Sequence, residues 1–141
     1  MKKVIITGAD GYVASRIIPH LETKYKLTLV DIDFKKTHSS ETIKFDICNS
    51  SLSELNDITK NHDAIIHLAY VRPEKTRDPN NLKQEIESFD TEHQNVFMAN
   101  KVYQSAFKND LSRVIVASSN HAADWYEHNE IHDNIRDMVS N

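Results

Sequence analysis

The chain reads Thr7-Gly8-Ala9-Asp10-Gly11-Tyr12-Val13-Ala14 between a short aliphatic run and an amphipathic segment. Both glycines of the chain lie in this stretch. At a junction of strand and helix, Gly8 would allow the tight turn that leaves the strand. Gly11 would let backbone N–H groups approach a pyrophosphate at the positive end of the helix, and Ala14 takes a third position that must stay small. A surface turn without a ligand is the alternative, because a short glycine motif is weak evidence by itself.

Short aliphatic runs alternate with helical patterns along the rest of the chain. Continuous apolar runs of strand length indicate strands buried on both faces, as in parallel sheets covered by helices. Apolar residues three or four apart indicate helices, although Pro19 removes a backbone donor from the first of them. Asp31–Thr42 is too polar and broken for a helix, and Tyr70–Asn81 reads as a long loop. The predicted strands are Lys3–Thr7, Leu27–Val30, Ile43–Ile47, Ala64–Leu68 and Arg113–Ala117, and the predicted helices are Tyr12–Lys24, Leu52–Thr59 and Lys83–Phe107.

This alternation predicts an α/β fold, a doubly wound parallel (Rossmann) sheet of about five strands in the order 3-2-1-4-5. The 141 residues suffice for one domain and are too few for two. Of these residues, 39% are hydrophobic and 27% charged, with a formal net charge of −4, which is ordinary for a globular protein. Lys and Arg form no patch, so we expect no nucleic-acid partner, and no apolar run approaches the ~20 residues of a membrane span. Cys48 is the only cysteine, which favours the reducing cytoplasm.

An acidic residue closes the second predicted strand, at Val30-Asp31. It follows the glycines by the ~20 residues at which a carboxylate can accept both hydroxyls of an adenosine ribose. A 2′-phosphate there would face a like charge, at a cost of roughly 1 to 4 kcal/mol per charge pair at ~4 Å. The cofactor is therefore predicted to be NAD rather than NADP. Asp33 is a competing candidate, and a solvated Asp at a strand end is the simpler alternative.

Several stretches, taken in order, resemble the extended short-chain dehydrogenase/reductase group, the NAD-dependent epimerase/dehydratase family, and within it uronate dehydrogenase-like members. Each motif is loose, but jointly they are specific and span nearly the whole chain. They are Thr7–Ala14, Val30-Asp31, Phe45-Asp46-Ile47, Ile65–Ala69, Asn95–Ala106 and Arg113–His121.

The resemblance implies roles for individual residues. Asp46 would bind the adenine amino group, and Leu68 and Ala69 would line the path of the pyrophosphate and the nicotinamide ribose. Asn95 would lie near the active site, and Ser119 would bind the hydroxyl of a sugar or sugar-acid substrate, faced also by Ser118, Asn120 and His121. The full set implied to bind NAD is Gly8, Asp10, Gly11, Tyr12, Val13, Asp31, Asp46, Ile47, Leu68 and Ala69.

The chain departs from the family at the catalytic base, a Tyr whose phenol pKa is lowered by a Lys four residues later. No Tyr here has a Lys at that spacing, and Tyr126 has Glu130, which would raise its pKa. We therefore expect residues 1–141 to form one NAD-binding domain, incomplete at its C-terminal end and without a substrate domain, which turns nothing over alone. A dinucleotide-sensing module without chemistry, or a truncated fragment without function, are the alternatives.

The remaining candidates are read more simply. His128 and His132 share a helical face, but no third ligand lies at a usual spacing, so no metal is expected. His67 is predicted to be a hydrogen-bonded core or near-cofactor residue, and Cys48 a small buried hydrophobe. Val96–Phe107 is interpreted as core, and the resemblance allows it to be a homodimer surface.

Overall fold

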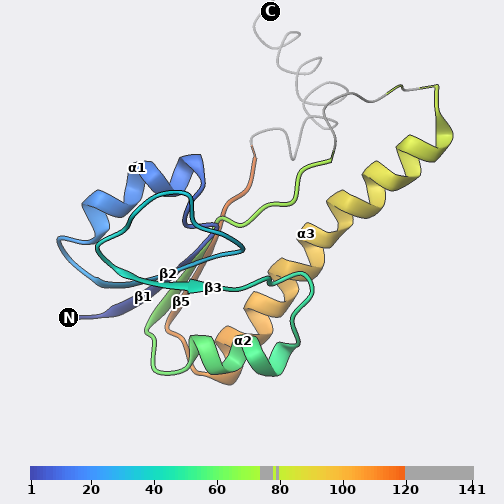
Figure 1. Cartoon of the computed structure of the whole chain (residues 1–141). Coiled ribbons are helices and arrows are strands. Elements are labelled where there is room, and N and C mark those ends of the chain that lie inside the picture. Colours follow the sequence, from blue (N-terminus) through green and yellow to red (C-terminus); the bar gives the residue numbers. More distant parts are fainter. Residues whose placement is uncertain (74–77, 79, 120–141) are drawn as a thin grey trace, which may run out of the picture.

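Five parallel strands form one sheet in the order β3-β2-β1-β4-β5 (Figure 1). The structure is a computed structural model and describes residues 1–73, 78 and 80–119. This order confirms the predicted topology. The strands are β1 (Lys3–Thr7), β2 (Lys26–Asp31), β3 (Glu41–Lys44), β4 (Ala64–His67) and β5 (Arg113–Val116), and the helices are α1 (Tyr12–Leu21), α2 (Leu52–Thr59) and α3 (Leu82–Lys108).

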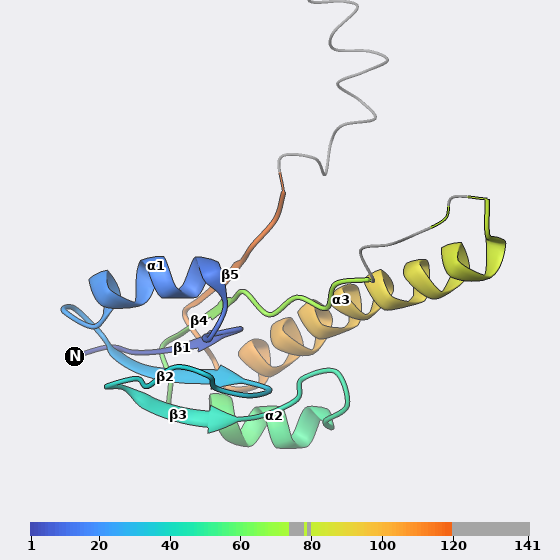
Figure 2. The same cartoon turned by 45° about the horizontal axis from the view of Figure 1, so that its top comes forward.

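Helices cover both faces of the sheet: α1 lies on one side, and α2 and α3 lie on the other (Figure 2). Successive residues of a strand point to opposite faces, so β1 contributes to two cores. Val4 and Ile6 pack under α1, against Ile18. Ile5 packs on the other face with residues of α2 and α3, among them Val102. The domain is therefore the doubly wound arrangement that the sequence predicts.

The third strand is the largest error in the predicted boundaries. It was expected at Ile43–Ile47, whereas β3 spans Glu41–Lys44 and pairs with Thr28–Asp31 of β2. Only Ile43 in β3 is partly buried, since this is an edge strand that needs little apolar surface. The apolar residues Phe45 and Ile47 belong to the connection that leaves the sheet and reaches the core under α2.

The prediction that the strands are buried on both faces is confirmed for the central strands and wrong for the edge strands β3 and β5. β1 and β2 are buried along nearly their whole length, whereas β5 alternates between exposed and partly buried residues. Ile115 is 47% exposed. An unbroken apolar sequence therefore does not identify a strand with helices on both sides.

The helices begin and end where proline and capping side chains favour it. α1 ends at Leu21, three residues before the predicted Lys24 and two after Pro19, whose missing N–H leaves the last turn one hydrogen bond short. α2 begins with a capping box, in which Ser51 and Glu54 satisfy each other's backbone donors. Asn81 caps α3 by accepting from the Gln84 N–H. Within the described ranges, no helix has the length and apolar content needed to cross a bilayer.

Candidate functional site

A cleft of about 780 Å³ lies at the carboxyl ends of the strands, where doubly wound sheets bind ligands. All ten residues predicted to bind the cofactor line it. The segments that contribute are the glycine turn, the end of β2 with the residues after it, the connection from β3 to α2, the loop after β4, and Met98 of α3. The structure thus brings the predicted residues together, although they come from four separate parts of the sequence.

Gly8 makes the turn out of β1 in a left-handed conformation and at a close backbone approach that together favour glycine. Its φ is +68°, and a Cβ at this position would lie 2.5 Å from the Ala69 backbone nitrogen. Gly11 is different, because its φ is −73° and a Cβ would meet the Gly8 carbonyl oxygen at 3.0 Å. The Gly11 N–H donates to that same oxygen at 3.1 Å. Gly8 therefore makes the tight turn that the sequence predicts, and its lack of a side chain also allows the β4 loop to approach it closely.

The N-terminus of α1 opens onto this cleft. Gly11 is the cap residue, and no side chain within the described part of the chain supplies the usual cap hydrogen bond. Tyr12 and Val13 line the cleft, and Ala14 is fully buried against the sheet. The first-turn N–H groups have no partner inside a helix and carry its positive dipole end, so this position favours an anion such as a diphosphate.

Asp31 closes β2 beside the glycine turn. One carboxylate oxygen accepts the Asp10 N–H at 2.9 Å, and the other accepts the Ile32 N–H at 2.8 Å. Each oxygen keeps a second lone pair that a ribose hydroxyl can use. The competing candidate, Asp33, also lines the cleft, but its carboxylate forms an exposed ion pair with Lys44.

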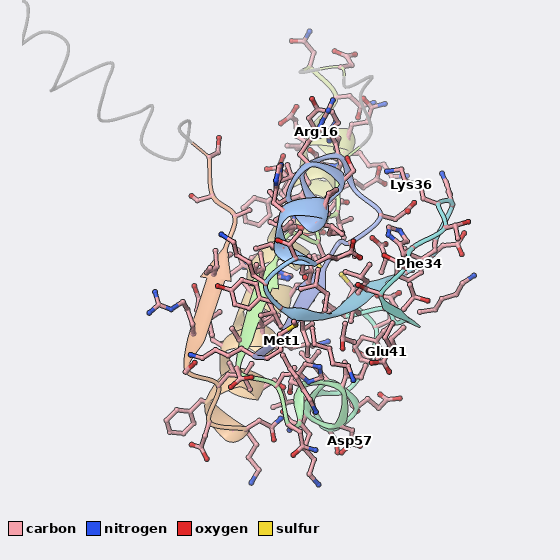
Figure 3. The ribbon with its side chains drawn as sticks, turned by 90° about the vertical axis from the view of Figure 1, so that its left-hand side faces the viewer. Met1, Arg16, Phe34, Lys36, Glu41 and Asp57 are labelled. Carbon is pink, nitrogen blue, oxygen red and sulfur yellow. The ribbon has the colours of Figure 1, made fainter. Side chains whose placement is uncertain are left out.

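The side chain of Asp10 holds the segment after β2 against the glycine turn. Its carboxylate accepts the Lys35 N–H at 3.1 Å and hydrogen bonds His38 Nε2 at 3.2 Å, and the Lys36 ammonium donates to its carbonyl at 2.9 Å. The Lys35 N–H is the main cause that lowers the Asp10 pKa. Figure 3 labels Lys36 and Phe34 on this segment, between β2 and β3. The carboxylate is therefore committed to protein groups, a role that the sequence did not indicate.

The turn that follows β3 carries Asp46, predicted to meet the adenine. Its carboxylate accepts the Asn49 side-chain N–H at 2.8 Å and the Asn49 backbone N–H at 3.2 Å. The side-chain bond is the largest cause of a lowered Asp46 pKa, so the group is ionised at neutral pH. Cys48 also lines the cleft, and burial raises the pKa of its thiol, which favours the neutral form. Lys101 of α3 donates to three carbonyls of this turn, a residue that the sequence analysis missed.

Asn95 lies on α3 beside the loop after β4, and does not itself line the cleft. Its Oδ1 accepts the Val71 N–H at 2.7 Å, and its Nδ2 donates to the Val71 carbonyl at 2.9 Å. Val71 lines the cleft. The observed geometry gives Asn95 a positioning role, while its predicted place near the chemistry stays a prediction.

The predicted substrate residues fall only partly within the described chain. Ser118 and Ser119 are exposed beyond β5 and do not line the cleft. Asn120, His121 and the Tyr126, His128 and His132 discussed above lie outside the described residues. Among residues 1–73, 78 and 80–119, no three His, Cys, Asp or Glu side chains are grouped as a metal site would require. The roles given to these serines therefore remain predictions.

Comparison with known proteins identifies the family of this chain. Residues 4–138 match the family model described as the NAD dependent epimerase/dehydratase family. The chain belongs to that family. The resemblance drawn from the motifs is confirmed, and so is the expected cofactor, since NAD is the cofactor of the family.

The names of several similar proteins describe enzymes that act on sugars or sugar acids. The chain is 31% identical over 84 residues to a dTDP-6-deoxy-L-talose 4-dehydrogenase (NAD(+)) of Aggregatibacter actinomycetemcomitans, covering 56% of this chain and 31% of that protein. A mutated uronate dehydrogenase superposes with a TM-score of 0.63 and 30% identity, over 85% of this chain and 40% of that one.

Uronate dehydrogenase of Agrobacterium tumefaciens, in a mutant form complexed with NAD, gives a TM-score of 0.66 at 24% identity, over 86% of this chain and 42% of that one. At this identity the likeness shows the fold. The chain thus spans less than half the length of the family members it matches.

Proposed function

We propose that this chain is the NAD-binding part of an NAD-dependent oxidoreductase of sugars or sugar acids, or of an epimerase or dehydratase acting on nucleotide sugars. One observation carries the proposal: the glycine turn, the α1 N-terminus without a capping side chain, and Asp31 border the same cleft. These groups supply a close backbone approach, a positive dipole end and a ribose acceptor, which together match a dinucleotide better than a generic anion.

Different cleft residues would bind different parts of NAD. First-turn N–H groups at Tyr12 and Val13 would hold the diphosphate, and Asp31 would accept the hydroxyls of the adenosine ribose. Asp46 and Ile47 would face the adenine, while Leu68 and Ala69 would border the nicotinamide ribose. When bound, NAD supplies a hydride acceptor to the reaction. The residues seen here bind and orient it.

The proton chemistry would require groups that these 141 residues do not contain. No Tyr-x-x-x-Lys occurs in the sequence, so no lysine ammonium is placed to lower a catalytic phenol pKa. Ser119, with Ser118, Asn120 and His121, would orient a substrate hydroxyl. We therefore propose a single domain that binds NAD, carries part of a substrate site, and lacks turnover by itself. The single cysteine supports placing it in the cytoplasm.

A binding titration and an activity assay on the 141-residue chain test this proposal. NADH fluorescence should rise on binding, NAD should compete for the same site, and galacturonate or glucuronate should yield no NADH. Failure to bind either nucleotide would reject the proposed cleft. Steady NADH formation would reject the claim of inactivity while leaving the binding site intact.

A dinucleotide sensor without chemistry is the second candidate, favoured by a formed cleft in a chain without the Tyr/Lys pair. The coding sequence beyond Asn141 separates the two. A downstream Tyr-x-x-x-Lys in frame supports the enzyme, and its absence supports the sensor.

A further inference from the structure

We infer that Lys101 is a positioning residue for adenine recognition, holding the turn after β3 in the shape that lets Asp46 face the base. This inference rests on the proposed function, because it assigns the turn to the adenine end of the NAD cleft. Lys101 contacts the turn through backbone carbonyls and does not line the cleft.

The Lys101 ammonium group uses three donors on one short turn. It donates to the carbonyls of Ile47 at 2.9 Å, Cys48 at 2.8 Å and Ser50 at 2.8 Å. A lysine ammonium has three N–H donors, so this turn can satisfy it fully. Charge-assisted hydrogen bonds of this length are stronger than neutral ones, and three of them converge on four consecutive residues. The turn is therefore fixed from α3.

The same turn presents the groups that face the cleft. The Ser50 N–H donates to the Asp46 carbonyl at 3.0 Å, and Asn49 donates twice to the Asp46 carboxylate. Asp46, Ile47 and Cys48 all line the cleft. Since the carbonyls held by Lys101 follow Asp46 directly, releasing them would free the turn that orients its carboxylate.

Helix α3 places Lys101 in register with two other contacts. Asn95, Met98 and Lys101 are three residues apart, so Met98 is the neighbour of both on the helix surface. Asn95 binds the Val71 backbone at the β4 side of the cleft, Met98 lines the cleft, and Lys101 binds the β3 side. One rigid helix therefore sets the separation of two cleft walls, and Lys101 governs only the wall that would meet the adenine.

The decisive experiment compares NAD with nicotinamide hypoxanthine dinucleotide, which carries an oxygen in place of the adenine amino group. Dissociation constants for both are measured by calorimetry for the wild-type chain, for Lys101→Met and for the control Lys83→Met. Lys83 lies on the same helix with its side chain 85% exposed, so its substitution removes an equal charge without touching the cleft. Lys101→Gln, which keeps two N–H donors, is a milder second variant.

The wild type should prefer NAD by about tenfold, as expected for one hydrogen bond to a charged acceptor. In Lys101→Met the preference should fall to within about twofold, with Lys101→Gln intermediate, whereas Lys83→Met keeps the full ratio. A general loss of stability would weaken both nucleotides and leave their ratio unchanged. A wild-type ratio in either folded Lys101 variant overturns the inference alone. A wild-type chain that binds neither nucleotide overturns the proposed function with it.

Discussion

His67 Nδ1 lies 2.7 Å from Thr7 Oγ1, and the two residues are register partners on the adjacent parallel strands β4 and β1. His67 is 4% exposed and Thr7 is fully buried. Burial lowers the pKa of His67 to about 4, so the ring is neutral at physiological pH. The sequence predicts either a hydrogen-bonded core residue or a residue near the cofactor, and the structure shows His67 buried and hydrogen bonded.

This histidine makes folding stability depend on pH. The unfolded chain protonates His67 below the ordinary histidine pKa of 6.5, but the folded chain does so only below about 4. Between these values the unfolded state binds more protons than the folded state. The contribution of His67 to folding stability is therefore complete above pH 6.5 and is lost as the pH falls toward 4. We expect the free energy of unfolding in urea to drop by about 3 kcal/mol across that window. His67→Asn, which can still bond Thr7 without titrating, should flatten the dependence. His20→Asn, at an exposed position of α1, should not.

Replacing each glycine by alanine should distinguish the strained, crowded position of Gly8 from the ordinary backbone of Gly11. Gly8→Ala forces a side chain into a left-handed backbone and against the Ala69 backbone, at an expected cost of about 3 kcal/mol or more. Gly11→Ala has an ordinary φ and a single contact at 3.0 Å, so it should cost clearly less. Thermal or urea unfolding of both variants measures the difference. Equal destabilisation would contradict the assignment of the tight turn to Gly8.

Cofactor choice should depend on Asp31 and not on Asp33. A 2′-phosphate beside the Asp31 carboxylate would experience a like charge, so we expect NADP to bind at least about tenfold more weakly than NAD. Asp31→Asn should narrow that ratio. Asp33→Asn should leave it nearly unchanged, because the Asp33 carboxylate is already paired with Lys44. Calorimetric titration of both nucleotides is the measurement, and equal affinities in the wild type would reject the role of Asp31.

The homodimer surface that the resemblance allows can be tested on α3. This helix exposes large apolar side chains, among them Phe89, Val96 and Phe97, which are 66%, 60% and 58% exposed. Contiguous exposed apolar surface favours association. We expect sedimentation to show a reversible, concentration-dependent dimer that Phe97→Glu weakens. Gln104→Glu adds the same charge at another exposed position of the helix and should have no effect; an unchanged monomer at all concentrations would reject the dimer.

The order of elements and the residues that line the cleft could be predicted from the sequence, because both rest largely on local signals. The glycine spacing, the aliphatic runs and an acid closing the second strand each fall within a few neighbouring residues. The resemblance to the family named Asp46 and Leu68, and the shared edge formed by the carboxyl ends of parallel strands explains why they lie in one cleft with Asp31.

Hydrogen bonds between residues far apart in the chain leave no comparable pattern in the sequence. Lys101 reaches a turn more than fifty residues earlier, and Asn95 reaches Val71 across the cleft wall. Asp10 was expected to meet the cofactor, and its position in the motif gave no indication that His38 and Lys35 would engage its carboxylate. The edge strand β3 was misplaced for a related reason, since its backbone pairing with β2 requires no apolar pattern.

The 27 residues of α3 make a helix about 40 Å long, whereas the longest strand, with six residues, spans about 20 Å. Its buried residues are Ser88, Met98, Val102, Ser105 and Ala106, so all but one lie in the second half. The first half projects past the sheet with little core to hold it (Figure 1). Its backbone amides should therefore exchange with solvent through local fraying, at a free energy well below that of global unfolding. The rim of the protein beyond the strands can thus melt and re-form while the sheet stays intact.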